Sequence, residues 1–220
     1  MTNDRLTVPQ KTPTDTAHAI AKAGLSVIPI IGGPAVELFQ YVIQPPLEKR
    51  RERWMADIGE KLHELEANGL KLESLQANEQ FISAVMYASQ IVLRTHQEAK
   101  LEALRNAILN VANGQAPDET FQNMFFNFID SLTEEHLRIL KVFQAPNSPP
   151  MMEMGSLNAI LEYNIPESQG QKDLYDQLWK DLFSRGLVNT DRMNITLSGR
   201  GLTEKQTTAI GDAFLKFITR

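Results

Sequence analysis

The stretch AGLSVIPIIGGPAVELFQYVI, residues 23–43, constrains the fold more than any other part of this sequence. It is apolar, but it is interrupted by Pro29, Gly32, Gly33 and Pro34. A proline inside a helix removes a backbone hydrogen bond, whereas proline is well tolerated at the first helical position. We therefore expect one helix to stop before Pro29 and a second helix to begin at Pro34.

This stretch is too short and too interrupted for a stable membrane span. Only fourteen uncharged residues separate Lys22 from Glu37, which is about 21 Å of helix, and a bilayer core needs about 30 Å. Its prolines and glycines would also leave backbone groups unsatisfied in lipid. The pattern predicts a broken apolar hairpin over residues 17–44. That hairpin either packs inside the protein's own helical bundle or inserts conditionally into a membrane.

A basic cluster containing a tryptophan follows directly after Pro45-Pro46. Lys and Arg are attracted to anionic headgroups, and Trp favours the membrane interface. The alternative is an ordinary solvated helix face, because Glu48 and Glu52 are interleaved with the cations. The candidate membrane or partner contacts are Pro29, Ile30, Ile31, Gly32, Gly33, Pro34, Lys49, Arg50, Arg51, Arg53 and Trp54.

Apolar residues at helical spacing predict helices along most of the remaining chain. One begins after a break at residues 44–46 and ends at Asn68-Gly69. A long helix of about 35 residues is expected from Asn78 to Asn113-Gly114. Ser131 and Glu134 have the spacing of a capping box. Further helices are expected after Pro117, over residues 132–143, 156–163 and 174–185, and around Ile210 to Phe217.

Alternation of apolar and polar residues over 193–198 predicts a short half-buried strand. A strand pair around Asn189-Thr190-Asp191, after three helices, is the order of a winged helix. The fold class is thus mainly α: an N-terminal helical bundle with the broken apolar hairpin, followed by a winged-helix-like C-terminal unit with a small β element. The expected parts are a flexible arm over 1–16, a helical domain over 17–130 and a winged-helix-like domain over 131–220.

Two clusters of large side chains are most simply interpreted as packing residues. One consists of Phe121, Phe125 and Phe128 at helical spacing. The other consists of Met151, Met152 and Met154, for which an exposed and adaptable partner surface is the alternative.

The composition excludes several functional classes. With 22 Lys and Arg against 27 Asp and Glu, the net charge is −5, which disfavours a protein that mainly coats nucleic acid. Residues 131–220 hold ten basic and eleven acidic side chains, so nucleic-acid binding is not expected there either. Cysteine is absent, which removes disulfides, thiolate nucleophiles and zinc–thiolate sites. The polar first sixteen residues are unlike a signal peptide, and we expect a cytoplasmic protein, with peripheral inner-membrane contact as a variant.

No catalytic signature is present in the sequence. The four histidines are isolated from one another and lack metal-ligand spacing, and no phosphate-binding loop or nucleophile elbow occurs. The sequence therefore predicts no enzyme activity, no cofactor and no metal site.

Two strings, EAKLEALRNA at residues 98–107 and LTEEHLRILK at residues 132–141, together with the Pro-Gly-Gly-Pro segment, resemble a group of uncharacterised bacterial proteins. That group is similar to the abortive-infection alpha type, which is linked to phage defence. The resemblance covers mainly residues 78–145 and carries over no functional residue. It implies a bacterial, non-enzymatic role in defence or envelope stress.

The function expected from the sequence is that of a non-enzymatic interaction or effector protein. It would have conditional membrane affinity through residues 17–44 and the basic cluster 49–53. Its expected partners are another protein or an anionic membrane surface, and a homo-oligomer is an open option. The alternatives are a winged-helix DNA-binding regulator and a structural helical protein whose hairpin stays buried.

Overall fold

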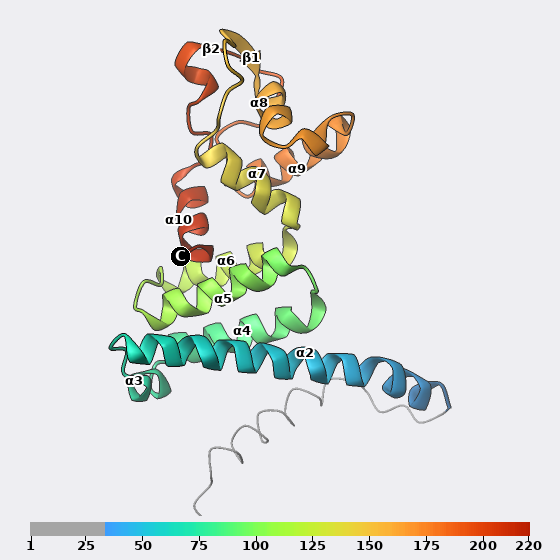
Figure 1. Ribbon diagram of the computed structural model, residues 1–220, viewed down its shortest axis with the longest axis vertical. Helices are drawn as coiled ribbons and strands as arrows, with labels where there is room; N and C mark the ends of the chain where they lie inside the picture. The colour runs from blue at the N-terminus through green and yellow to red at the C-terminus, as the bar shows by residue number, and fades with distance from the viewer. Residues whose placement is uncertain (1–33) are drawn as a thin grey trace, which may run out of the picture. The chain divides into compact units, whose positions relative to one another are not determined.

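The computed structural model describes the backbone of residues 34–220 and the side chains from residue 41 onward. The chain divides into two compact units, residues 1–48 and Lys49–Arg220. The described residues are mainly helical and contain one small two-stranded sheet (Figure 1). The prediction of a mainly α fold with a small β element is therefore confirmed.

Helix α2, Pro34–Ala67, begins at the predicted proline but does not break where we expected. Pro45 and Pro46 both lie inside it, so the predicted break at residues 44–46 is wrong. Each proline leaves one carbonyl of the preceding turn without its helical donor. Those carbonyls belong to Tyr41 and Val42, whose side chains are exposed, so water can satisfy them.

The end of α2 agrees with the sequence. The helix stops at Ala67, and Gly69 adopts a positive φ of 102° that closes the turn. The amide N–H of Leu70 then donates to the carbonyl of Leu65 at 3.0 Å, the pattern of a glycine-terminated helix. A short helix α3, Leu72–Gln76, follows.

The predicted long helix is two helices, α4 (Glu79–Arg94) and α5 (Glu98–Ala112), which pack against each other (Figure 1). The break falls at Thr95, whose backbone is extended. Its hydroxyl accepts a hydrogen bond from the amide of Gln97 at 3.2 Å. A threonine hydroxyl that bonds a nearby backbone group competes with helix formation, so the expectation of one continuous helix was wrong.

Helices α6 (Glu119–Ser131) and α7 (Glu134–Gln144) are both capped at their N-termini. The side chain of Asp118 accepts hydrogen bonds from the amides of Thr120 and Phe121. The capping box of α7 pairs Thr133 with His136. The predicted box of Ser131 with Glu134 is wrong, because Ser131 still belongs to α6.

The C-terminal part continues with β1 (Met154–Ser156), α8 (Leu157–Asn164), the 3-10 helix η1 (Pro166–Ser168), α9 (Lys172–Ser184), β2 (Thr196–Ser198), the 3-10 helix η2 (Gly199–Leu202) and α10 (Ala209–Ile218). The two strands pair antiparallel, with Met154 opposite Ser198.

The location of this strand pair differs from our expectation. The partner of β2 comes from residues 154–156, and the segment around residues 189–191 forms no strand pair within the described chain. Only an isolated bridge between Val188 and Thr207 occurs nearby. The predicted alternation is nevertheless present, because Met193 is buried while Ile195 and Leu197 are half-buried and their neighbours are exposed.

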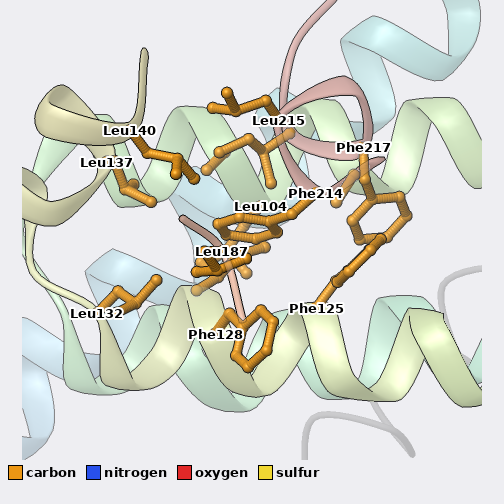
Figure 2. Packing of buried hydrophobic residues seen from close by; sticks show 14 of the residues in the cluster. Leu104, Phe125, Phe128, Leu132, Leu137, Leu140, Leu187, Phe214, Leu215 and Phe217 are labelled. Carbon is orange, nitrogen blue, oxygen red and sulfur yellow. The ribbon is translucent and has the colours of Figure 1, made fainter. Parts of the chain in front are cut away.

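Aromatic side chains form the centre of the core. The ring of Phe125 on α6 lies 5.5 Å from Phe214 and 5.6 Å from Phe217, both on α10, measured between ring centroids. Figure 2 shows these rings converging with Leu104 from α5. Phe125 and Phe128 are buried as predicted, whereas Phe121 is 37% exposed.

Helix α5 also holds the C-terminal end of α10 through side-chain hydrogen bonds. The amide Nδ2 of Asn110 lies 2.9 Å from the carbonyl oxygen of Phe217 and 3.0 Å from that of Thr219. Asn106 donates in the same way to the carbonyl of Ile218 at 3.1 Å. The last carbonyls of a helix have no intrahelical donor, so these two asparagines cap α10 from outside.

Candidate functional site

One side of α2 is fixed against the body of residues 49–220. Trp54, Ile58 and Leu65 are buried on that side, and their spacing places them on one helix face. The indole Nε1 of Trp54 donates to the hydroxyl of Ser89 on α4 at 3.3 Å. On α5, Arg105 Nε donates to the carboxylate of Asp57 at 2.6 Å. The segment of α2 after residue 49 is thus held by both α4 and α5.

This packing divides the basic cluster that the sequence suggested. Lys49 and Arg53 are exposed. Arg50 is partly buried, and its Nη1 donates to the carbonyl of Leu93 at 3.0 Å. Arg51 is also only partly exposed, and Trp54 is 4% exposed. Trp54 therefore lies in the core, whereas Lys49 and Arg53 lie on the solvent-exposed surface.

The other predicted contact residues lie mostly outside the described structure. Pro29, Ile30, Ile31, Gly32 and Gly33 precede the first described residue, and Pro34 begins α2. Within residues 34–48, Tyr41 is 81% exposed and Val42 is 53% exposed.

The exposed side of α2 carries an ordered set of charges. Lys49 and Arg53 come first along the helix, and Glu60 and Glu64 follow one and two turns beyond Ala56. The sequence interpretation singled out the cations and missed the two glutamates. The signal was nevertheless present, because these residues recur at helical spacing on the side opposite Trp54 and Ile58.

A second polar cluster is buried where α5, α7 and α9 approach one another. His136 is 4% exposed. Its Nδ1 accepts a hydrogen bond from the amide of Thr133 at 3.0 Å, and Thr133 Oγ1 lies 2.8 Å from the same nitrogen. The opposite ring nitrogen, Nε2, lies 3.6 Å from a carboxylate oxygen of Asp181, which is too long for a hydrogen bond.

Burial lowers the pKa of His136, because a charged imidazolium would lose its hydration. The carboxylate of Asp181 opposes this shift, while Arg185 and Lys100 add to it. The ring is therefore neutral at pH near 7, with Nδ1 serving as the acceptor that caps α7. In this arrangement the histidine performs the role that Glu or Gln has in the usual capping box.

Lys100 is a second buried titratable side chain of this region. Its Nζ donates to the carbonyl of Asp130 at 2.7 Å and so caps the end of α6. Burial lowers the pKa of Lys100, the charge of Asp130 opposes this change, and Arg94 reinforces it. His136 and Lys100 therefore both have structural partners at helix ends.

The surface of the described part includes two small hollows. One hollow of about 130 Å³ is lined by Asp176, Lys180, Asp191, Arg192, Met193 and Asn194. Another, of about 330 Å³, is lined by Ala99, Glu134, Glu135, Leu137, Arg138 and Lys141. Ligand pockets usually occupy 300–1,000 Å³ and are mainly apolar, and these two hollows lie at or below that range.

Two kinds of feature are absent from the part of the chain that the structure describes. No group of three or more His, Asp or Glu side chains there is placed to hold a metal ion. In the same part of the chain, no helix combines the length and the hydrophobicity that crossing a bilayer requires. Comparison with protein-family models, with curated proteins and with solved structures finds no match to this chain.

The two strings behind the family resemblance are placed in the core. Residues 98–107 form most of α5 and include the fully buried Leu104. Residues 132–141 form the turn into α7 and most of that helix, including the buried His136 and Leu140. Their packing explains these strings structurally.

The His136 cap makes the stability of the chain depend on pH. The pKa of His136 is lower in the folded chain than in the unfolded one, so its contribution is fully present above about pH 6.5 and is lost as the pH falls. Gln at position 136 can accept the same hydrogen bond without titrating. We expect the free energy of unfolding, measured with urea at each pH, to fall more steeply between about pH 7 and about pH 5 in the wild type than in His136→Gln.

His136→Ala serves as the companion variant. It removes the acceptor altogether and should cost about 1 kcal/mol at neutral pH, the usual magnitude for a lost cap. If wild type and His136→Gln give parallel curves over this pH range, His136 does not couple protonation to folding.

Proposed function

We propose that this chain is a non-enzymatic interaction protein that docks reversibly on an anionic membrane surface. Docking would use residues 17–44 together with the exposed cations Lys49 and Arg53. The observation that carries the proposal is the exposure of Tyr41 and Val42 on α2, at 81% and 53%. A Tyr ring with a polar tip and an apolar body suits the boundary between lipid and water.

The expected contributions to the free energy of binding make the affinity for a membrane conditional. Each cation near an anionic surface contributes about 1 kcal/mol, so Lys49 and Arg53 together contribute about 2 kcal/mol and cannot hold the protein on a membrane alone. The remainder would come from burial of apolar side chains, at about 1.5–3 kcal/mol for each large one that is fully buried. Trp54, which is buried in the core, takes no part.

For the biological context we propose phage defence in a bacterium. The support is the resemblance of residues 98–107 and 132–141 to proteins similar to the abortive-infection alpha type. An effector that acts at the inner membrane from the cytoplasm agrees with a surface that binds lipid only under some conditions.

We further propose that residues 131–220 form a winged-helix-like unit that binds a protein. The order α7, β1, α8, α9, β2, with β1 and β2 antiparallel, supports this arrangement. Helix α9 would then be the exposed recognition helix, yet residues 172–185 carry three basic and three acidic side chains. Lys172 is already paired with Asp176. Such a surface matches a protein partner better than a phosphate backbone.

The exposed methionines near the sheet extend this candidate protein-binding surface. Met151 is fully exposed and Met154 is 65% exposed, while Met152 packs against the core. Flexible, polarizable methionines are common on surfaces that adapt to a partner. The simple packing interpretation of this cluster therefore applies to Met152 alone.

Membrane docking is tested by co-flotation of the full-length protein with vesicles containing anionic lipid. We expect binding to anionic but not to neutral vesicles, weakening as salt is raised. The double variant Lys49→Gln, Arg53→Gln should bind about 30-fold more weakly, which corresponds to the loss of about 2 kcal/mol.

The matched control is Lys141→Gln, Lys180→Gln, which removes the same charge from exposed positions on α7 and α9. It should bind as the wild type does. Equal loss in both variants would mean that only net charge matters, and absence of binding by the wild type would refute membrane docking and favour a purely structural helical protein.

The DNA-binding alternative receives a separate test. A mobility-shift titration of the full-length chain against duplex DNA at low salt should show no complex under our proposal. A retarded band that is lost on Lys180→Gln, Arg200→Gln would instead identify residues 131–220 as a DNA-binding winged helix.

A further inference from the structure

The side of α2 opposite its buried face has an unusual charge order. Between Lys49 and Ala67, the exposed Glu52 and His63 point away from Trp54 and Ile58; beside them runs a line formed by Lys49, Arg53, Ala56, Glu60 and Glu64, all of them exposed. They follow one another at intervals of four, three, four and four residues, so they form one stripe along the helix. We call this stripe the outer face of α2. It is basic in its first half and acidic in its second.

Interactions within the described chain do not explain this order. The charged groups of Lys49, Arg53 and Glu60 have no hydrogen-bond or ion-pair partner within 4 Å among residues 41–220. Glu64 pairs with Lys61 at 2.7 Å, on its own helix. Within the part of the chain whose side chains the structure describes, three of the four charges on the outer face are thus exposed and have no ion pair.

The charges are arranged symmetrically about a point on the helix. Arg53 and Glu60 lie at equal distances, about 5 Å along the axis, on either side of the midpoint between Ala56 and Asp57. Lys49 and Glu64 also lie at equal distances, about 11 Å, from the same midpoint. In both pairs the sign changes across the midpoint.

We propose that the outer face of α2 binds a second copy of this chain in an antiparallel, two-fold symmetric dimer. A two-fold axis through the midpoint places Arg53 of each copy opposite Glu60 of the other. It places Lys49 opposite Glu64 in the same way. Such a contact is isologous, so each pair occurs twice. Parallel pairing would instead set like charges against each other.

The centre of the outer face suits close approach of two helices. Ala56 lies beside the axis and has no side chain beyond Cβ. Small residues at a helix crossing let the backbones approach. Because exposed ion pairs are weak and screened by salt, the dimer is reversible and strongest at low ionic strength.

The dimer covers Lys49 and Arg53, the cations that membrane docking would use. Self-association and lipid binding therefore compete for one surface. The inference stands on the charge order of the outer face and does not depend on membrane affinity.

A charge-swap experiment tests the dimer. Sedimentation velocity of the full-length protein at low salt should show a monomer–dimer equilibrium that weakens as salt is raised. Arg53→Glu and Glu60→Arg should each raise the dimer dissociation constant at least about tenfold, because each sets like charges opposite each other at both ends of the contact. An equimolar mixture of the two variants should associate again, since every opposed pair then has opposite signs.

The control is Arg200→Glu, an exposed reversal on η2 that should leave the equilibrium unchanged. Because Arg53 and Glu60 are exposed, both variants should retain the thermal unfolding midpoint of the wild type. A wild type that stays monomeric at all concentrations, or a mixture that fails to associate, overturns the proposal. In vesicle flotation, Glu60→Arg should still bind anionic lipid, so loss of the dimer is distinguishable from loss of membrane docking.

Discussion

The enclosure of α5 is the constraint on which the rest of residues 49–220 depends. Its residues Leu104, Ala107 and Ile108 are fully buried, and the helix packs against α4, α6 and α10. Where neighbouring helices end against such an enclosed helix, the backbone groups that become buried need hydrogen-bond partners from the protein. Asn110 supplies such a partner for α10, and Lys100 supplies one for α6. The C-terminal helix α10 is thereby held against α5 in the core of the fold.

The same packing gives the buried polar side chains structural roles. The buried polar side chains Lys100, Asn110 and His136 are each engaged at the end of a neighbouring helix or at the start of their own. Leaving such groups unpaired would cost about 1–3 kcal/mol each. Their identities are therefore set by the packing. On the exposed side of α2, by contrast, Lys49, Arg53 and Glu60 have no ion-pair partner among the described side chains.

Helix ends coded by local signals could be predicted from the sequence. Asn68-Gly69 and Pro117-Asp118 end and begin helices where expected. The break at Thr95 was missed because it depends on one side-chain hydrogen bond that competes with the helix. The continuation through Pro45-Pro46 was missed because proline weakens a helix without necessarily ending it. The pairing of β1 with β2 joins residues about forty positions apart, which no local pattern encodes.

At the candidate site, too, some features could be predicted from the local sequence and others depend on tertiary contacts. Periodicity located the buried stripe of α2 and hence its exposed side. It could not tell that Trp54 would bond Ser89, or that Arg50 would reach Leu93, because those contacts require the position of α4. The division of the basic cluster between core and surface therefore becomes visible only in the structure.

Helix α2 is held by its inner face against a body organised around α5, and its outer face is exposed in the described part of the chain. Native-state hydrogen exchange of the full-length chain tests this arrangement most directly. We expect the amides of α2 from Trp54 to Leu65 to exchange with the same free energy as those of α5 and α10, which is the free energy of global unfolding. Exchange of the α2 amides at a much lower free energy than those of α5 would show that α2 detaches on its own, and would contradict this arrangement.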